Sequence, residues 1–220
     1  RADSFYYGDS QLRLAVREAA FAERSGLAVS SMRGTFTMDS THLALPALRV
    51  RTAAGTDVAL GFAMDLNAFA DVQPGTLQAT LRGQIGRQDL LLLAADNLPR
   101  TLARHWPRQP LVVHGGVGGN LQRLRVRQLA LRLPTALSVR ADGFLEHLDR
   151  PDRLRARLQV QAQTDRLDFV AALLPPAVRG TVRIPRGIGF RGQVDVDGPR
   201  YASRFTATQG GGSVGGMVWV

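Results

Sequence analysis

The chain of 220 residues contains 28 arginines, no lysine and 18 acidic residues, so its formal net charge at neutral pH is +10. The absence of cysteine and lysine excludes disulfides, thiol nucleophiles and every reaction that needs a lysine amine. The positive charge would suit nucleic acid, but the arginines are dispersed and only 6% of residues are aromatic, so base-stacking surfaces are scarce and no nucleic-acid partner is expected.

The two ends of the chain indicate a larger protein. No run approaches the ~18 apolar residues of a membrane-spanning helix, and no signal peptide opens the sequence at Arg1. The last residues, Met217 to Val220, resemble the middle of a strand. We therefore expect the chain to be a piece of a longer protein whose membrane anchor lies outside it.

The first 66 residues predict a series of strands. Residues 1–10 are polar with three aromatic side chains and fit a loop or the end of a strand. Alternation from Gln11 to Glu23 predicts a strand, with a helix through residues 17–22 as the competitor. Three further strands, each with one apolar face, are predicted between Ser25 and Leu66. The second of these changes parity at Pro46, which predicts a bulge or an edge position.

The next segment predicts a strand followed by a helix. Residues 77–85 alternate most regularly in the whole chain and predict a strand. The alternation stops at Arg87, and residues 90–95 predict a short helix with Asp89 near its N-terminus. Residues 98–110 contain several prolines and predict a connection.

A second series of elements follows in the same order. Strands are predicted at residues 111–119, 121–133, 135–144 and 154–162. A second helical run is predicted at residues 166–174, before Pro175. Further short strands are predicted around residues 182–184, 194–196, 201–205 and 218–220. We interpret the glycines between them as turns or bulges.

An internal repeat of 77 residues is predicted. Residues 76–95 and 153–172 match at seven positions and share the order of strand, break, helix and proline. We therefore divide the chain into three units. The first covers residues 1–108 with a helical insert near 89–97, the second covers 109–186 with an insert near 165–174, and a truncated third covers 187–220.

No catalytic, cofactor or metal site is expected. The histidines lie in different predicted elements without the spacing of a metal site, so surface positions are expected for His42, His105, His114 and His147. The glycines at 115–119 do not precede a helix, as a phosphate-binding loop requires. Because no motif combines a nucleophile, a base and an orienting residue, we expect no enzymatic activity.

The strands share an apolar face with few elements to cover it. Alternation places six residues inward: Leu60, Phe62, Leu81, Leu137, Val139 and Leu158. It places three arginines outward: Arg82, Arg140 and Arg157. A closed sandwich or barrel would bury the apolar face internally, whereas an open sheet would leave it for an apolar ligand.

The segment that starts at Glu23-Arg24-Ser25-Gly26-Leu27 carries a family resemblance. Residues 38–45 (MDSTHLAL) and 48–52 (LRVRT) follow the order of strand, D-x-T-x-L-x-L, polar turn and strand. Over residues 11–98, and more loosely beyond them, the chain resembles the periplasmic repeats of the TamB and AsmA-like family. The resemblance implies a mainly β fold, namely a long curved antiparallel sheet (a β-taco or open groove) of repeated strands, here with two short helical inserts.

The resemblance also implies a function. Family members are anchored in the inner membrane, cross the periplasm, and are linked to outer-membrane assembly and to phospholipid movement between the membranes. The implied ligand is a phospholipid acyl chain. The implied groove lining consists of Phe36, Leu43, Leu45, Leu60, Phe62, Met64, Leu77, Leu81, Leu137, Val139, Leu158 and Val160. The alternative is a structural or chaperone-like module whose open strand edges engage outer-membrane β-barrel precursors by strand addition. An outer-membrane β-barrel assembly protein is a further expected partner.

Overall fold

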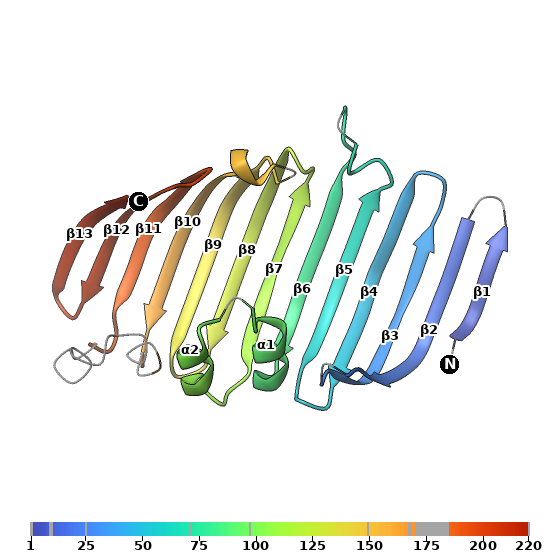
Figure 1. The fold of residues 1–220 in the computed structure, drawn as a ribbon, viewed down its shortest axis with the longest axis horizontal. Coiled ribbons are helices and arrows are strands. Elements are labelled where there is room, and N and C mark those ends of the chain that lie inside the picture. The colour runs from blue at the N-terminus through green and yellow to red at the C-terminus, as the bar shows by residue number, and fades with distance from the viewer. Residues whose placement is uncertain are drawn as a thin grey trace.

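The structure is a computed structural model that describes residues 2–8, 11–24, 26–70, 72–96, 98–148, 150–166, 169 and 185–219. Within them, thirteen strands form one antiparallel sheet in which each strand pairs with the strand before it in the chain (Figure 1). The first and the last strand do not pair with each other, so the sheet is open. This confirms the predicted mainly β, open antiparallel sheet, and the alternative of a closed sandwich or barrel is wrong.

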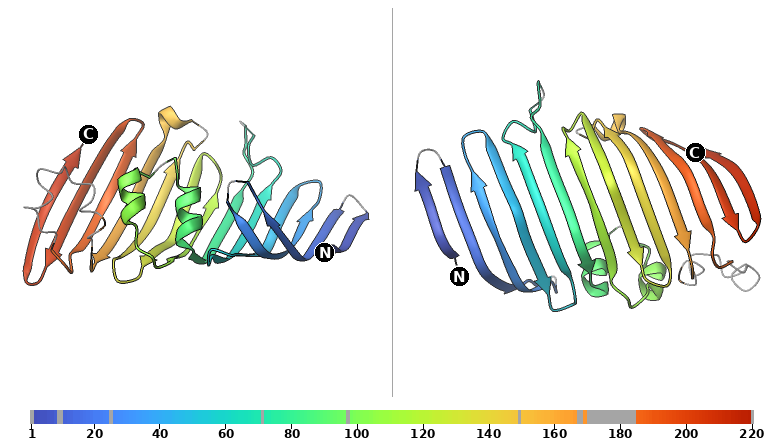
Figure 2. Two further views of the ribbon diagram at one scale, coloured as in Figure 1. Left: turned by 60° about the horizontal axis from the view of Figure 1, so that its bottom comes forward. Right: turned by 180° about the vertical axis from the view of Figure 1, so that it is seen from behind.

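The sheet contains thirteen described strands, and helices lie in the connections between some of them. The strands are β1 (Ala2–Gly8), β2 (Gln11–Ala22), β3 (Ala28–Met38), β4 (His42–Thr52), β5 (Asp57–Asp65), β6 (Leu77–Ile85), β7 (Leu111–Gly119), β8 (Arg123–Leu133), β9 (Leu137–Glu146), β10 (Arg155–Thr164), β11 (Gly189–Asp197), β12 (Arg200–Gln209) and β13 (Gly212–Trp219). The described helices are α1 (Arg87–Leu93), α2 (Arg100–His105) and the 3-10 turn η1 (Pro151–Arg153). Figure 2 shows that the sheet is curved and that α1 and α2 lie on the same side of it.

Glycines allow the tight turns that make consecutive strands antiparallel. Gly198 has a φ of 57° between β11 and β12, and Gly210 has a φ of 55° between β12 and β13. Side chains disfavour this left-handed region, whereas glycine adopts it readily. These turns therefore direct the chain straight back, and the sheet grows in the order of the sequence.

Two bulges preserve the apolar face where the sequence changes parity. The pairing of β4 with β5 shifts between Leu45 and Leu48, which confirms the bulge predicted at Pro46. A second shift lies in β8 between Val126 and Leu129, within a segment predicted as an uninterrupted strand. There Gln128 has a φ of 49°, and its amide N–H donates to Asp142 Oδ1 at 2.7 Å. Each bulge returns the following leucine to the apolar face.

One packed group of buried residues lies at one end of the central strands. Buried Leu133, Ala136 and Phe169 form a hydrophobic cluster there, and four half-buried residues pack against it: Leu102, Trp106, Leu111 and Leu137. The rings of Trp106 and Phe169 meet edge to face at 5.5 Å between centroids. Because Leu102 belongs to α2 and Leu137 to the apolar face of β9, this helix covers one end of that face.

The helices begin and end at residues other than those predicted. The helix predicted at residues 90–95 is present as α1 and starts three residues earlier. The connection predicted at 98–110 is wrong for its first half, which forms α2. Pro99 precedes α2 and Pro107 follows its C-cap, Trp106, so the prolines mark the boundaries of a helix rather than its absence. The second helical insert, at 165–174, falls mostly outside the described residues, as does the strand near 182–184.

The C-terminal strand is longer than predicted. It begins at Gly212 rather than at Val218, and Gly215 and Gly216 pair with Thr206 and Phe205 inside the ladder. The prediction of a turn or bulge at Gly215 is therefore wrong. Glycine carries no side chain, so it interrupts the apolar and polar alternation without interrupting the strand.

The sheet continues through both predicted boundaries between repeat units. β6 pairs with β7 on either side of residues 108–109, and β10 pairs with β11 on either side of residues 186–187. The division into repeat units stays a prediction.

Candidate functional site: an apolar sheet face

The apolar face is organised in rows that cross the sheet perpendicular to its strands. Residues that pair directly across antiparallel strands share a face, so the register defines each row. One row from β4 to β11 consists of Leu45, Phe62, Ala79, Val117, Val126, Gly143, Leu158 and Val194. The neighbouring row consists of Leu43, Met64, Leu77, Gly119, Leu124, Leu145, Ala156 and Val196. The face is thus apolar without interruption over eight strands.

The twelve residues predicted to line a groove all lie on this face. The register joins Leu43 to Met64 and Leu77, Leu45 to Phe62, and Leu60 to Leu81. Farther along the sheet, Val139 pairs with Ala162 and Leu158 with Gly143. All twelve are half-buried. The structure therefore gathers them on one surface.

The opposite face is polar and rich in arginine. Arg82 pairs with Ala59 and His114, Arg140 with Ala130 and Gln161, and Arg157 with Phe144 and Asp195. The side chains of the three predicted outward arginines are exposed. This polar face also carries Phe144, which the sequence did not single out. The guanidinium groups of Arg123 and Arg125 lie 4.6 and 5.6 Å from its ring centroid and cover it.

Most of the apolar face has the burial of a surface rather than of a core. Only eleven described apolar residues are buried, and no large described side chain is fully buried. Leu60, Phe62 and Leu81 are only half-buried in the middle of their strands. Since a packed interior buries side chains on all sides, this part of the face lacks a second layer among the described residues.

A buried carboxylate anchors the helices to the sheet. Asp89 in α1 is 3% exposed and accepts hydrogen bonds from the hydroxyls of Thr52 and Thr56, at the turn between β4 and β5. The Thr56 hydroxyl in turn accepts the Gly86 amide N–H at 2.9 Å. The sequence predicted Asp89 near the start of a helix, but its carboxylate holds the sheet instead of capping the helix.

Arg87 joins the two helices to each other. Its Nε donates to the carbonyl of Trp106 and its Nη2 to the carbonyl of Ala103, both at 3.1 Å. These carbonyls lie at the C-terminal end of α2, where backbone acceptors lack partners within the helix. The two helices therefore form one cap over the apolar face, tied to the sheet through Asp89.

The opposite strand ends are held by exposed aspartates. Asp39 accepts hydrogen bonds from the amides of Thr41 and His42, and these donors lower the pKa of its carboxyl. Asp65 accepts from the amide and hydroxyl of Thr76, which likewise lowers its pKa. This network explains the D-x-T spacing, because the carboxylate and the threonine close the turn between β3 and β4.

His42 links these two aspartates. Its Nδ1 lies 2.7 Å from the Thr41 hydroxyl and its Nε2 lies 3.0 Å from Asp65 Oδ1. The Thr41 hydroxyl, the His42 imidazole and the Asp65 carboxylate thus lie in series. However, the His42 side chain is 64% exposed, and the Thr41 hydroxyl also contacts Asp39 at 2.9 Å, so the series serves the turns. His42 occupies the rim position that was expected for it.

Other chemistry finds little support in the part of the chain that the structure describes. There, no three histidine, aspartate or glutamate side chains gather as ligands for a metal ion. In the same ranges, none of the helices has the length and apolar character to cross a membrane. Comparisons with family models, with curated proteins and with solved structures found no match. The family resemblance therefore stays a prediction.

Proposed function

We propose that the chain is a periplasmic segment of a TamB/AsmA-like protein whose apolar sheet face forms a groove for phospholipid acyl chains moving between the inner and outer membranes. In this proposal the protein is anchored to the inner membrane through a segment outside this chain. The observation that carries it is the apolar face, which is continuous over eight strands, whose twelve predicted lining residues are half-buried, and which lacks a covering layer over β4 to β6 among the described residues.

Acyl chains fit the physical character of this face. Contact between a hydrocarbon chain and leucine, valine or phenylalanine side chains removes apolar surface from water and gains roughly 25 cal/mol for each Å². The contact is non-directional, so it needs no polar group at a fixed position. In the rows described above, every member is apolar or glycine, which suits a ligand that slides along the sheet.

The head group would remain in solvent at the rim of the groove. The apolar face offers no charged row to bind it, whereas the arginines lie on the opposite face. The cap formed by α1 and α2 covers one end of the strands, and the apolar side chains in the middle of β4, β5 and β6 are only half-buried. An acyl chain would accordingly lie beside the cap, along the rows that contain Phe62 and Leu81.

Crosslinking at two adjacent residues tests the groove. Leu81 and Arg82 are neighbours in β6, and the pleat points them to opposite faces. A photoactivatable benzoylphenylalanine at Leu81 is expected to crosslink phospholipid when the protein is irradiated in cells. The same group at Arg82 is expected to crosslink little or none. Lipids extracted from the purified protein and identified by mass spectrometry would give the head group and acyl length.

The outcome separates the proposal from its alternative. Equal lipid crosslinking at both positions would indicate nonspecific membrane contact and would contradict the groove. Crosslinks at Trp219 in the edge strand β13 that contain an outer-membrane protein, together with no lipid at Leu81, would favour the chaperone-like module instead. Phe62 provides a second test position, since benzoylphenylalanine replaces one aromatic side chain by another, and Ala63 is its neighbour on the polar face.

A further inference from the structure

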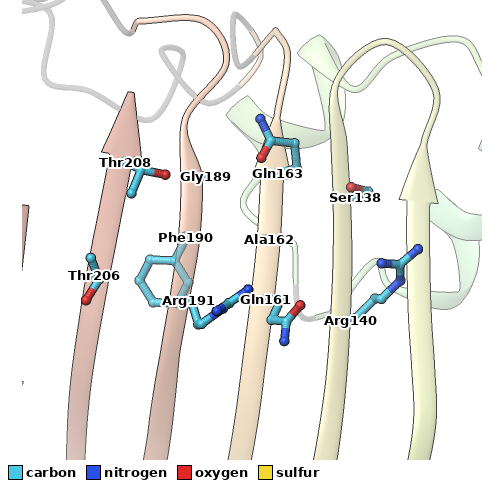
Figure 3. Close-up of a pocket in the computed structure, with 10 residues that line it drawn as sticks. All are labelled: Ser138, Arg140, Gln161, Ala162, Gln163, Gly189, Phe190, Arg191, Thr206 and Thr208. Atoms are coloured by element: carbon cyan, nitrogen blue, oxygen red, sulfur yellow. The ribbon is translucent and has the colours of Figure 1, made fainter. Parts of the chain in front are cut away.

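A hollow of about 570 Å³ lies on the polar face over strands β9 to β12 (Figure 3). Its described lining is dominated by hydrogen-bond donors: two arginines, two glutamines and three hydroxyl residues. They come from four different strands, so the register rather than a loop sets their positions. Among the described residues that line the hollow there is no carboxylate.

The donors lie in two rows of the ladder. In the first row, Gln161 pairs with Arg140 on one side and with Arg191 on the other. Figure 3 shows the Arg191 side chain extending toward Gln161. Strands are spaced about 4.8 Å apart, so the two arginine Cα atoms are separated by roughly 10 Å. Both guanidinium groups can therefore reach a single ligand placed above Gln161.

The second row forms one side of the hollow. Here Gln163 pairs with Ser138 and Gly189, and Gly189 pairs with Thr208. A Cβ atom at Gly189 would lie only 2.6 Å from the Thr208 hydroxyl oxygen and 3.2 Å from Gln163 Oε1. The glycine thus leaves space between two polar side chains, where any larger residue would stand in contact with both.

The arginines of this hollow differ from two other arginines on β10 in their partners. Arg155 and Arg157 in β10 form ion pairs with Asp197 and Asp195, each at 3.0 Å. Arg140 and Arg191, by contrast, form no ion pair with any described residue, and both are exposed. An arginine that lacks an internal carboxylate keeps its donors available for an external oxyanion.

We propose that this hollow binds a phosphate group. Arg140 and Arg191 would donate to its oxygens from two sides, and the amide of Gln161 and the hydroxyl of Thr206 would contact it from the strands between and beside them. Guanidinium groups match phosphate geometry with paired donors, and neutral amides and hydroxyls add further hydrogen bonds. The phosphate belongs either to a soluble phosphate ester or to a phospholipid head group. The site is independent of the groove, because it lies on the opposite face.

Two probes distinguish the sources of the phosphate. Soluble glycerol phosphate is titrated calorimetrically into the purified chain, and vesicles of phosphatidylcholine with or without phosphatidylglycerol are tested by flotation. Binding of glycerol phosphate without flotation identifies a soluble ester. Flotation that depends on phosphatidylglycerol identifies a head group. Binding of neither probe by the unmodified protein overturns the proposal.

Matched variants separate a site from general charge. Arg140→Gln with Arg191→Gln is expected to weaken binding at least about tenfold, because each removed donor pair contributes about as much as a charged hydrogen bond. Arg13→Gln with Arg33→Gln removes the same charge from the polar face of β2 and β3 and is expected to change affinity less than about twofold. Equal weakening by both double variants overturns the proposal.

A third variant tests the shape of the hollow at unchanged charge. Gly189→Ala is expected to weaken binding because the new methyl group crowds Thr208 and Gln163. Thermal melting of every variant is measured in parallel. Because Arg140 and Arg191 are exposed, their double variant is expected to melt like the unmodified protein. If Gly189→Ala melts normally and binds as tightly as the unmodified protein, the phosphate does not occupy this hollow.

Discussion

Leu133 and Leu60 lie on the same apolar face of the same sheet, yet they belong to different environments. Leu133 is 3% exposed at the strand end beneath the helical cap, where Ala136 and Phe169 surround it. Leu60 is half-buried in the middle of β5, and its row partners Leu48 and Leu81 are half-buried as well. The two regions have the same residue types and the same parity.

The difference teaches that alternation alone does not distinguish a core from a binding surface. A strand pattern states which side chains share a face, whereas a second layer decides whether that face is buried. At Leu133 the layer comes from Leu102 and Trp106, in the connection between β6 and β7, and from Phe169, in the connection between β10 and β11. Equivalent substitutions in the covered and the uncovered region should therefore have unequal effects, and four experiments use this inequality.

The largest effect is expected for Leu133→Arg. The guanidinium would replace a leucine side chain beneath the cap without a carboxylate partner, so we expect a loss of about 4 kcal/mol or more in the free energy of unfolding. Urea denaturation followed by circular dichroism measures it. A variant that melts within about one degree of the unmodified protein would show that the cap does not cover this position.

The next effect is expected for Asp89→Ala. It would leave the hydroxyls of Thr52 and Thr56 without their common acceptor, which costs about 2 to 3 kcal/mol for a buried pair of this kind. Hydrogen exchange should show α1 losing protection before the strands do. Asp96→Ala, at an exposed position after α1, is the control and should change stability by less than about 0.5 kcal/mol.

A smaller loss of stability is expected for arginine in the uncovered region. Leu60→Arg, Phe62→Arg and Leu81→Arg should each cost only about 1 kcal/mol, since the stem lies along the apolar face and the charge reaches water. The same variants should abolish lipid crosslinking because the side chain blocks the rows. If any of them unfolds the protein as strongly as Leu133→Arg, the uncovered region is in fact a core.

The smallest effect is expected from pH at the strand ends opposite the cap. The donors around Asp39 and Asp65 hold the pKa of both carboxyls below their usual value of 3.8. A carboxyl with a lowered folded-state pKa stabilises the protein above its unfolded pKa, and this stabilisation is lost as the pH falls through the folded pKa.

We therefore expect the urea midpoint to decrease as the pH is lowered from about 5 to about 3. Asp39→Asn with Asp65→Asn should make this decrease smaller, because an asparagine amide does not titrate in that range. An unchanged pH dependence in the double variant would assign the decrease to other carboxyls. Asp57 is one such group, since its hydrogen bond with Arg49 also lowers its pKa.

The sequence predicts most of the sheet, and the reasons for its failures are specific. Leu81 and Arg82 are assigned to opposite faces correctly, because successive side chains of a pleated strand point to opposite faces and the sequence alternates between apolar and polar residues accordingly. The bulge at Pro46 is predicted because proline draws attention to the change of parity. The same change between Val126 and Leu129 carries no proline and is missed, although the spacing of the two apolar pairs is alike.

The alternation of apolar and polar residues does not predict burial or long-range contacts. Nothing in the residues 98–110 indicates that Leu102 and Trp106 pack over Leu133, because that contact depends on where the connection folds back. The hydroxyls that surround Asp89 are 33 and 37 residues away in the chain. The phosphate-binding hollow was likewise invisible, since it requires the register of four strands at once.

The pairing of each strand only with its neighbours in the chain gives the molecule an unusual way to change size. Removing or adding one hairpin would alter the length of the sheet by two strand spacings, about 10 Å, and leave the cross-section of the apolar face unchanged. The length of such a sheet is therefore proportional to its number of hairpins. Insertion or deletion of a two-strand segment would change this length in steps, while the surface of the remaining strands stays the same.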